Sequence, residues 1–239
     1  LGVGGRGGQT RDRTASALVG RAVSLGLIED IDNPMPSPFA EDDPRGQITW
    51  RQWLTMTDGL DYTEIGSTGL NDNDVVQMMY GPGRFDVIGY VRDELPPQRK
   101  PGVEWNYSTA GFHLIGWALQ AVVSDNTTCS HPEIDLCPEA KEDQQWFSGA
   151  VSALLFDPIG MDSAIITDDP TDLSDNYSES YEISLIDGEL RLMANPPIAL
   201  IAPSGAVWSN IEDMARYVIT QMNVGVTPDG TRIVSEEAL

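Results

Sequence analysis

The sequence has few basic side chains and no long hydrophobic run. Lys and Arg number 14 against 37 Asp and Glu, which gives the 239 residues a formal net charge of −23. Such a charge repels phosphate backbones and anionic lipid surfaces, so neither nucleic acid nor an anionic membrane is expected as a partner. No apolar run approaches the roughly 20 residues that cross a bilayer, and the first residues do not resemble a signal peptide. A membrane span is therefore not expected.

Cysteine and histidine are also scarce, with two of each. His113 and His131 have no Cys-x-x-Cys pair to complete a zinc site. Cys129 and Cys137 lie in a polar stretch in which a disulfide can close a short loop, and two free thiols in a surface insertion are the alternative. A disulfide favours an oxidising compartment, so we expect an extracytoplasmic protein, either periplasmic or secreted.

The first 13 residues differ in composition from the rest of the chain. Residues 1–13, LGVGGRGGQTRDR, are rich in Gly and Arg and have no apolar period. Helical spacing of apolar residues begins abruptly at Thr14. We therefore expect residues 1–13 to be disordered or non-native, for example through a reading-frame slip in the source. Residues 14–239, in a chain that is 41% hydrophobic, are long enough to form one globular domain.

Several amphipathic patterns predict core helices. Helical spacing of apolar residues covers 14–25, 75–80, 112–123, 144–156 and 214–222. Thr49 and Gln52 have the spacing of a capping box, and the short helix that they open should end near Gly59. Ser209 and Glu212 have the same spacing ahead of the last helix.

One β-hairpin is expected late in the chain. The segments 181–186 and 189–193 flank Asp187-Gly188, a pair typical of a two-residue type I′ turn in which both central residues have positive φ. No internal repeat and no linker divides the chain.

The most informative segment for function is 101–110, PGVEWNYSTA, in which Tyr107 immediately precedes an amphipathic helix. This segment resembles the "PG…F-x-Y-S-x" motif of serine hydrolases with the β-lactamase-like, penicillin-recognising fold. These include class C β-lactamases, DD-peptidases, family VIII esterases and 6-aminohexanoate-dimer hydrolases. In that family the Tyr lies in the active site beside a Ser nucleophile and a Lys, so the resemblance implies that Tyr107 is catalytic.

Other blocks resemble the same family in the same order. Residues 48–60, ITWRQWLTMTDGL, are similar to "ITLRHLLTHTSGL", and residues 155–161, LFDPIGM, are similar to "LFEPLGM". Residues 202–209 and 212–217 resemble "AGGLWST" and "DLARF". Four ordered blocks are much harder to obtain by chance than one. The resemblance covers the chain from Thr14 onward and identifies 14–239 as part of a β-lactamase-like serine hydrolase domain.

Two family motifs have no counterpart in the sequence. The family uses Ser-x-x-Lys, because a Ser hydroxyl needs a neighbouring base to become a nucleophile. Counting back from the block at 16–20 places Gln9 at the Ser position and Asp12 at the Lys position, and neither can serve. The alternative pair Thr10 and Arg13 fails because Arg stays protonated. The third motif, Lys-Thr-Gly or His-x-Gly on a late strand, is not found after Ser204.

The resemblance implies an α+β fold of the β-lactamase/DD-peptidase type. Because the first strands and the third motif are not recognisable, we expect this chain to contain mainly the helical lobe, with one hairpin and most of the antiparallel sheet missing. The implied function is hydrolysis of a small ester, amide or lactam through an acyl-enzyme, without metal or organic cofactor. A catalytically inactive homologue that serves as a binding or scaffold module is the alternative.

Individual residues retain alternatives at this level. Tyr107 is either catalytic or an aromatic residue of the core, and as a base its phenol needs a pKa below the usual value of about 10. Thr109 stands where relatives carry Asn or Ser, so it either donates a hydrogen bond to substrate or is the N-cap of the helix. Ser108 is interpreted as backbone scaffolding and His113 as an ordinary buried histidine.

Overall fold

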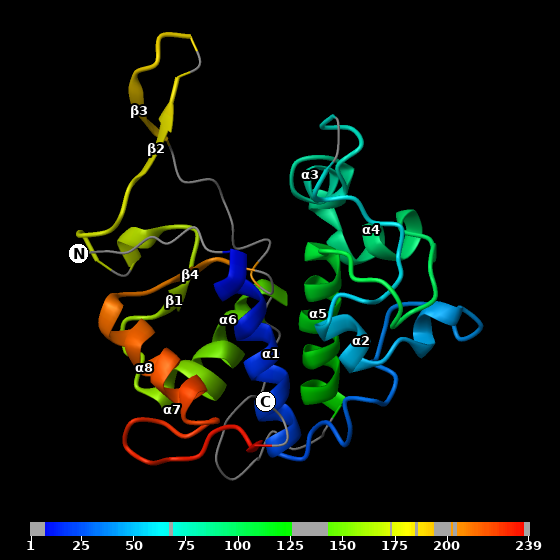
Figure 1. Ribbon diagram of the computed structural model, residues 1–239, viewed down its shortest axis with the longest axis horizontal. Helices are drawn as coiled ribbons and strands as arrows, with labels where there is room; N and C mark the ends of the chain where they lie inside the picture. Colours follow the sequence, from blue (N-terminus) through cyan, green and yellow to red (C-terminus); the bar gives the residue numbers. More distant parts are fainter. Residues whose placement is uncertain are drawn as a thin grey trace.

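The computed structural model describes residues 8–66, 69–125, 143–172, 174–184, 186–193, 202 and 205–236. Within these ranges the chain is mainly helical, with two small antiparallel sheets (Figure 1). None of the helices in this part of the chain is both long and apolar enough to cross a membrane. Cys129, His131 and Cys137 lie outside the described residues, and so does the predicted disulfide.

Most of the described elements are α-helices and short helical turns. The α-helices are α1 Gly8–Ser24, α2 Trp50–Leu54, α3 Asp74–Met79, α4 Val87–Glu94, α5 Thr109–Asp125, α6 Asp143–Val151, α7 Asp157–Ile159 and α8 Ile211–Met222. Short 3-10 turns cover Pro44–Gln47, Pro82–Phe85 and Pro170–Asp172, and a π-helical turn covers Ser152–Phe156. The strands are β1 Ile165–Ile166, β2 Ser180–Ile183, β3 Leu190–Met193 and β4 Val207–Trp208.

Helix α5 is the centre of the core. Its buried apolar side chains point to more than one side of the helix, which is typical of a helix surrounded by protein. They are Ala110, Phe112, Leu114, Ile115, Ala118 and Leu119. Helices α1, α2, α4 and α6 all contact α5, and α1 also contacts the π-helical turn. Figure 1 shows α1 and α5 running side by side through the middle of the molecule.

Helix α1 begins earlier than the apolar pattern does. Its buried face, with Leu18, Val19 and Ala22, confirms the predicted helix. The helix starts at Gly8, so the backbone of residues 8–13 is helical, and the prediction that residues 1–13 are disordered or non-native stays a prediction. Adding a residue to an existing helix is far easier than nucleating one, so a packed helix can extend into a segment that has no apolar pattern of its own. The domain boundary at Thr14 stays a prediction.

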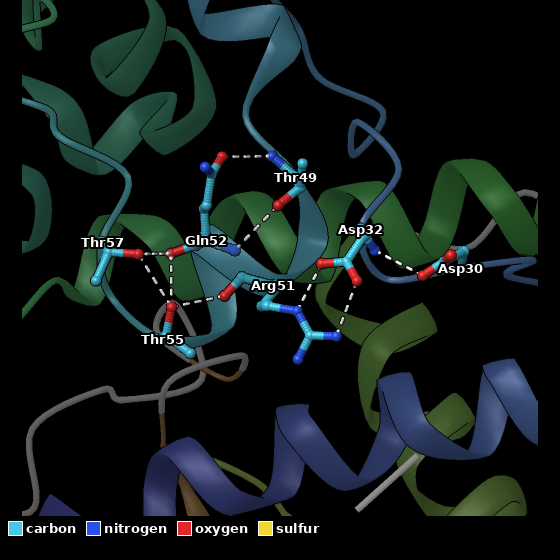
Figure 2. Close-up of polar contacts among 7 residues, drawn as sticks. All are labelled: Asp30, Asp32, Thr49, Arg51, Gln52, Thr55 and Thr57. Atoms are coloured by element: carbon cyan, nitrogen blue, oxygen red, sulfur yellow. Dashed lines mark hydrogen bonds and ion pairs between the residues drawn. The ribbon is translucent and has the colours of Figure 1, made fainter. Parts of the chain in front are cut away.

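The capping box predicted at Thr49 is confirmed at the start of α2 (Figure 2). The backbone N–H of Gln52 donates to Thr49 Oγ1 at 3.3 Å, and the N–H of Thr49 donates to Gln52 Oε1 at 3.0 Å. On the same helix, Arg51 forms an ion pair with Asp32 at 2.6 Å. The helix is short, ending at Leu54, because a left-handed residue, Met56 with φ 54°, turns the chain before Gly59.

Thr49→Ala should lower the free energy of unfolding by about 1 kcal/mol, because it leaves the Gln52 N–H without its acceptor at the start of α2. Chemical denaturation measures the change. Asp32→Ala is the matched control: it breaks the ion pair with Arg51, but both side chains are more than half exposed, so the unfolding midpoint should hardly change. Equal effects of the two substitutions would contradict the assignment of the cap.

The predicted hairpin is present, but its turn is different. Strands β2 and β3 pair antiparallel, with Ile183 opposite Leu190, and they project from the body of the molecule (Figure 1). Gly188 has a φ of 74°, whereas Asp187 does not have positive φ, so the two-residue type I′ turn is wrong. The backbone N–H of Ser184 donates to Glu189 O at 2.9 Å and closes a longer loop. Asp187 instead uses its side chain to accept from the N–H of Glu189.

Two further expectations about helix ends require correction. The cap of α8 is Asn210, whose Oδ1 accepts from the N–H of Asp213 at 2.8 Å, and not Ser209. The helix predicted over 144–156 is interrupted by the π-helical turn, followed by α7, which ends at the left-handed Gly160. Leu154, Leu155 and Phe156 are all buried there, which is more than one face of a regular surface helix can bury.

Candidate active site

The candidate site is the start of α5, where Tyr107 directly precedes the helix. Ser108 caps it: the backbone N–H of Gly111 donates to Ser108 Oγ at 3.0 Å. The N-cap is therefore Ser108, and the alternative interpretation of Thr109 as the cap is wrong. Ser108 is 1% exposed, which agrees with its interpretation as scaffolding.

The segment before Tyr107 is fixed by backbone contacts to the loop that follows α2. The N–H of Gly102 donates to Thr57 O at 2.7 Å, and the N–H of Asn106 donates to Met56 O at 2.9 Å. The backbone at Arg99 approaches this loop closely at position 59. Only glycine fits there, since its φ is 81° and a Cβ would lie 2.4 Å from Arg99 O. The block 48–60 and the Tyr107 motif thus form one structural unit, although about fifty residues separate them.

Thr109, the first residue of α5, is held by a carboxylate. Its N–H donates to Glu64 Oε2 and its hydroxyl donates to Glu64 Oε1, each at 3.0 Å. The hydroxyl of Tyr62 donates to the same Oε2 at 3.0 Å. Thr109 is 7% exposed, so in this structure its hydroxyl donates to Glu64 and faces little solvent. Its predicted role in binding substrate stays a prediction.

Tyr107 itself is half-buried and packs against the hydrophobic core. Its ring centroid lies 6.3 Å from that of Trp105, with the ring planes tilted by 54°. Trp105 is 61% exposed, whereas Trp50 and Trp53 are buried in the core. His113 is buried one turn into the helix, as predicted, and burial lowers its pKa to about 4. At neutral pH it is an uncharged core residue.

Asp58 is a buried carboxyl group beside the same helix end. Its Oδ1 accepts from the N–H of Leu60 at 2.9 Å, and its Oδ2 has no hydrogen-bond partner among the described residues. A Cβ placed on Gly111 would lie 3.7 Å from that Oδ2, which locates the carboxyl at the first turn of α5. Burial raises the pKa of Asp58. In the family block quoted above, this position is Ser.

Asp58→Asn should raise the free energy of unfolding at pH 7 by about 1 to 2 kcal/mol, because a neutral amide keeps the bond to Leu60 and removes a buried charge. The folded-state pKa is raised, so the native protein is penalised increasingly as the pH rises above the unfolded value near 3.8. The gain should therefore shrink as the pH falls toward 3.8. Urea denaturation at several pH values measures it, and a gain that is independent of pH would contradict this account.

The N-terminal part of α1 contains Gln9 and Asp12, the positions to which the sequence comparison assigned the family's Ser and Lys, and that assignment stays a prediction. Gln9 and Asp12 both belong to this helix and are three residues apart, a spacing that places them on one face. In Figure 1, α1 and α5 each begin at the upper end of the helix, below α3 and the β2–β3 hairpin. The starts of α1 and α5, the second directly preceded by Tyr107, therefore lie at the same end of two contacting helices. Neither an amide nor a carboxylate at these positions provides a nucleophile and a base.

One hollow of the described part lies away from the start of α5. This shallow hollow near residues 40–45 and 92–97 is lined by prolines and by Arg45, whose Nη1 donates to Leu95 O, and it includes neither Tyr107 nor Thr109. No cluster of His, Cys, Asp and Glu that fits a metal ion occurs within the same residues.

Comparison with known proteins gives the family. A family model described as Beta-lactamase matches residues 14–239. The chain belongs to the Beta-lactamase family. No curated protein sequence gives a significant match. This assignment confirms the resemblance found in the sequence, from the same starting residue, Thr14.

Solved structures of this family share the fold. An octameric penicillin-binding protein homologue from Pyrococcus abyssi is similar over 95% of this chain with a TM-score of 0.65 and 16% identity. A penicillin-binding protein from Bacillus halodurans gives 0.63 and 18%, and a D-stereospecific amidohydrolase from Streptomyces sp. gives 0.61 and 17%, each over 95% of this chain. The chain spans only 46%, 61% and 61% of those three structures, respectively. These values confirm the predicted fold class, with a mainly helical part of the β-lactamase fold and two small sheets.

Proposed function

We propose that the parent protein of this chain is a serine hydrolase that cleaves small esters or amides through an acyl-enzyme. In this chemistry a Ser hydroxyl adds to the substrate carbonyl while its proton passes to a Lys and Tyr pair. The proton then goes to the leaving alcohol or amine, and water releases the acyl group. Tyr107 is the residue of this chain that takes part. Membership of the Beta-lactamase family supports this class of chemistry.

The observation that carries the proposal is the shared end of α1 and α5. Family chemistry requires the hydroxyl, the amine and the phenol at one place, and the backbone of this chain brings positions 9, 12 and 107 to the same end of two contacting helices. Esters and amides are favoured over lactams because Thr109 replaces the Asn common in lactamases. The similarity to a D-stereospecific amidohydrolase and to a D-amino acid amidase supports the same substrate class.

The alternative is a homologue that keeps the fold as a binding or scaffold module. One specific observation favours it: Gln9 and Asp12 occupy the two positions that would have to be Ser and Lys. If residues 1–13 are native, the chain has no Ser-x-x-Lys nucleophile at positions 9 and 12. We therefore expect the chain with this sequence to show no turnover of esters.

The experiment restores the motif and uses a fluorophosphonate probe, which forms a covalent adduct with an activated Ser. The native chain should give no adduct by mass spectrometry, and the double variant Gln9→Ser/Asp12→Lys should be labelled at position 9. Adding Tyr107→Phe to that variant should slow labelling by roughly 100-fold, since general acid–base groups contribute 10²–10⁴-fold. Circular dichroism checks that each variant is folded.

Two outcomes would overturn the proposal. A folded double variant that is not labelled would overturn the proposal that Ser and Lys at positions 9 and 12 complete an active site with Tyr107 in this chain. Equal labelling rates with Tyr and Phe at position 107 would remove Tyr107 from the mechanism. Resequencing the parent gene upstream of Thr14 separates the two functions, because an intact frame without Ser-x-x-Lys favours the inactive homologue.

A further inference from the structure

The polypeptide on both sides of Tyr107 is tied to a single loop, residues 56–64. On the N-terminal side, Asn106 is held twice: its N–H donates to Met56 O at 2.9 Å and its Nδ2 donates to Tyr62 O at 2.8 Å. On the C-terminal side, Glu64 binds Thr109 through both carboxylate oxygens. Tyr107 therefore lies between two anchored residues, and both anchors come from the same short loop.

The Glu64 carboxylate is the strongest of these anchors. It accepts three hydrogen bonds, from the N–H and the hydroxyl of Thr109 and from the hydroxyl of Tyr62, each at 3.0 Å. Hydrogen bonds to a charged acceptor are about twice as strong as those between neutral groups. The carboxylate also lies at the N-terminus of a 17-residue helix, where negative charge is stabilised by the helix dipole.

The partners of Glu64 are themselves fixed. Tyr62 is 3% exposed, and burial, together with the Glu64 charge, raises its pKa, so its hydroxyl remains a donor at physiological pH. The side chain of Asn73 donates through Nδ2 to Glu64 O at 3.0 Å and holds the loop from its other side. The carboxylate therefore has a defined position before any substrate binds.

We propose that Glu64 is a positioning residue that fixes the placement of Tyr107 through Thr109. Glu64 does not touch the reacting atoms. Its bonds to the first residue of α5 set where the helix begins, and so set the direction in which the residue two positions earlier enters the site. The catalytic consequence rests on the proposed function, whereas the placement of Tyr107 does not.

The placement is tested with 3-fluorotyrosine incorporated at position 107 and observed by fluorine NMR. The native protein should give one narrow signal. Glu64→Gln and Thr109→Val should each shift or broaden it, because each removes at least one bond between Glu64 and Thr109. Thr109→Ser, which keeps both the N–H and the hydroxyl, should restore the native signal.

Asp61→Asn is the matched control. It makes the same change from carboxylate to amide in the same loop, but Asp61 accepts from Gln98 Nε2 and has no hydrogen bond to α5 within the described residues, so the signal should not move. Thermal melting of each variant separates this local effect from unfolding. A native signal in both Glu64→Gln and Thr109→Val would overturn the proposal, even if both variants are less stable.

The effect of Glu64 on reaction rate is tested in the Gln9→Ser/Asp12→Lys double variant with the fluorophosphonate probe. Glu64→Gln should slow labelling by roughly 10- to 100-fold, because a misplacement of about 1 Å can cost 10²-fold. Asp61→Asn should not slow it. If the double variant itself is not labelled, the proposed function fails, and the NMR result still decides the placement of Tyr107. Labelling that is unchanged by Glu64→Gln would overturn the positioning role.

Discussion

Replacing His113 by Leu should flatten the pH dependence of stability between pH 6.5 and pH 4. His113 is 6% exposed in the middle of the core, and its Nε2 has no hydrogen-bond partner among the described residues. Burial lowers its pKa from 6.5 to about 4, because the imidazolium cannot be solvated there. The unfolded chain therefore binds a proton on His113 at a pH where the folded chain does not.

The sign and size of the change in stability with pH follow from this difference in proton binding between the folded and the unfolded chain. The contribution of neutral His113 is complete above pH 6.5 and is lost as the pH falls toward 4. The full loss is roughly 3 kcal/mol, since a tenfold change in proton affinity is worth about 1.4 kcal/mol. The native protein should lose that much more stability than His113→Leu over this interval.

Urea denaturation of both proteins between pH 7 and pH 4 measures the difference. The carboxylates titrate in both proteins, so subtracting the two curves isolates the histidine. The chain has one other histidine, His131, which is present in both proteins and therefore cancels in the subtraction. A native-like loss of stability in His113→Leu would mean that the buried imidazole is not its source.

Features of the fold that depend on neighbouring residues could be predicted from the sequence. The capping box at Thr49 was predictable because its two partners are three residues apart. The buried face of α1 and the core helix α5 were predictable because a helix repeats its apolar positions at short, regular spacing. The hairpin position was predictable from Asp187-Gly188, but its turn type was not, because a longer loop uses the same two residues differently.

The missed features depend on contacts that are distant in sequence. Glu64 binds a residue 45 positions later, and no local pattern marks it as different from the other acid side chains. Asp58 left a visible signal, since it replaces Ser in a block that otherwise follows the family, but its burial is a property of the packed helix α5. Asn210 shows the limit of local rules: two adjacent residues can each cap a helix, and only the backbone path selects one.

Raising the salt concentration should stabilise the protein strongly. The chain has 37 acidic and 14 basic side chains, so even complete one-to-one pairing would leave 23 carboxylates without a Lys or Arg. A net charge this far from zero destabilises the compact state through self-repulsion. Increasing KCl from 0.1 M to 1 M shortens the Debye length from about 10 Å to about 3 Å and screens that repulsion.

The melting temperature should rise by roughly 10 °C over this range, which corresponds to about 3 kcal/mol for a protein of this size. Salt also strengthens hydrophobic burial, so a charge-reduced variant is needed to separate the two effects. Glu29→Gln, Glu41→Gln, Asp42→Asn and Asp175→Asn remove four exposed charges without touching the core. The combined variant should be more stable at 0.1 M KCl and should gain less from added salt. An equal gain in both proteins would assign the salt effect to hydrophobic burial instead of charge repulsion.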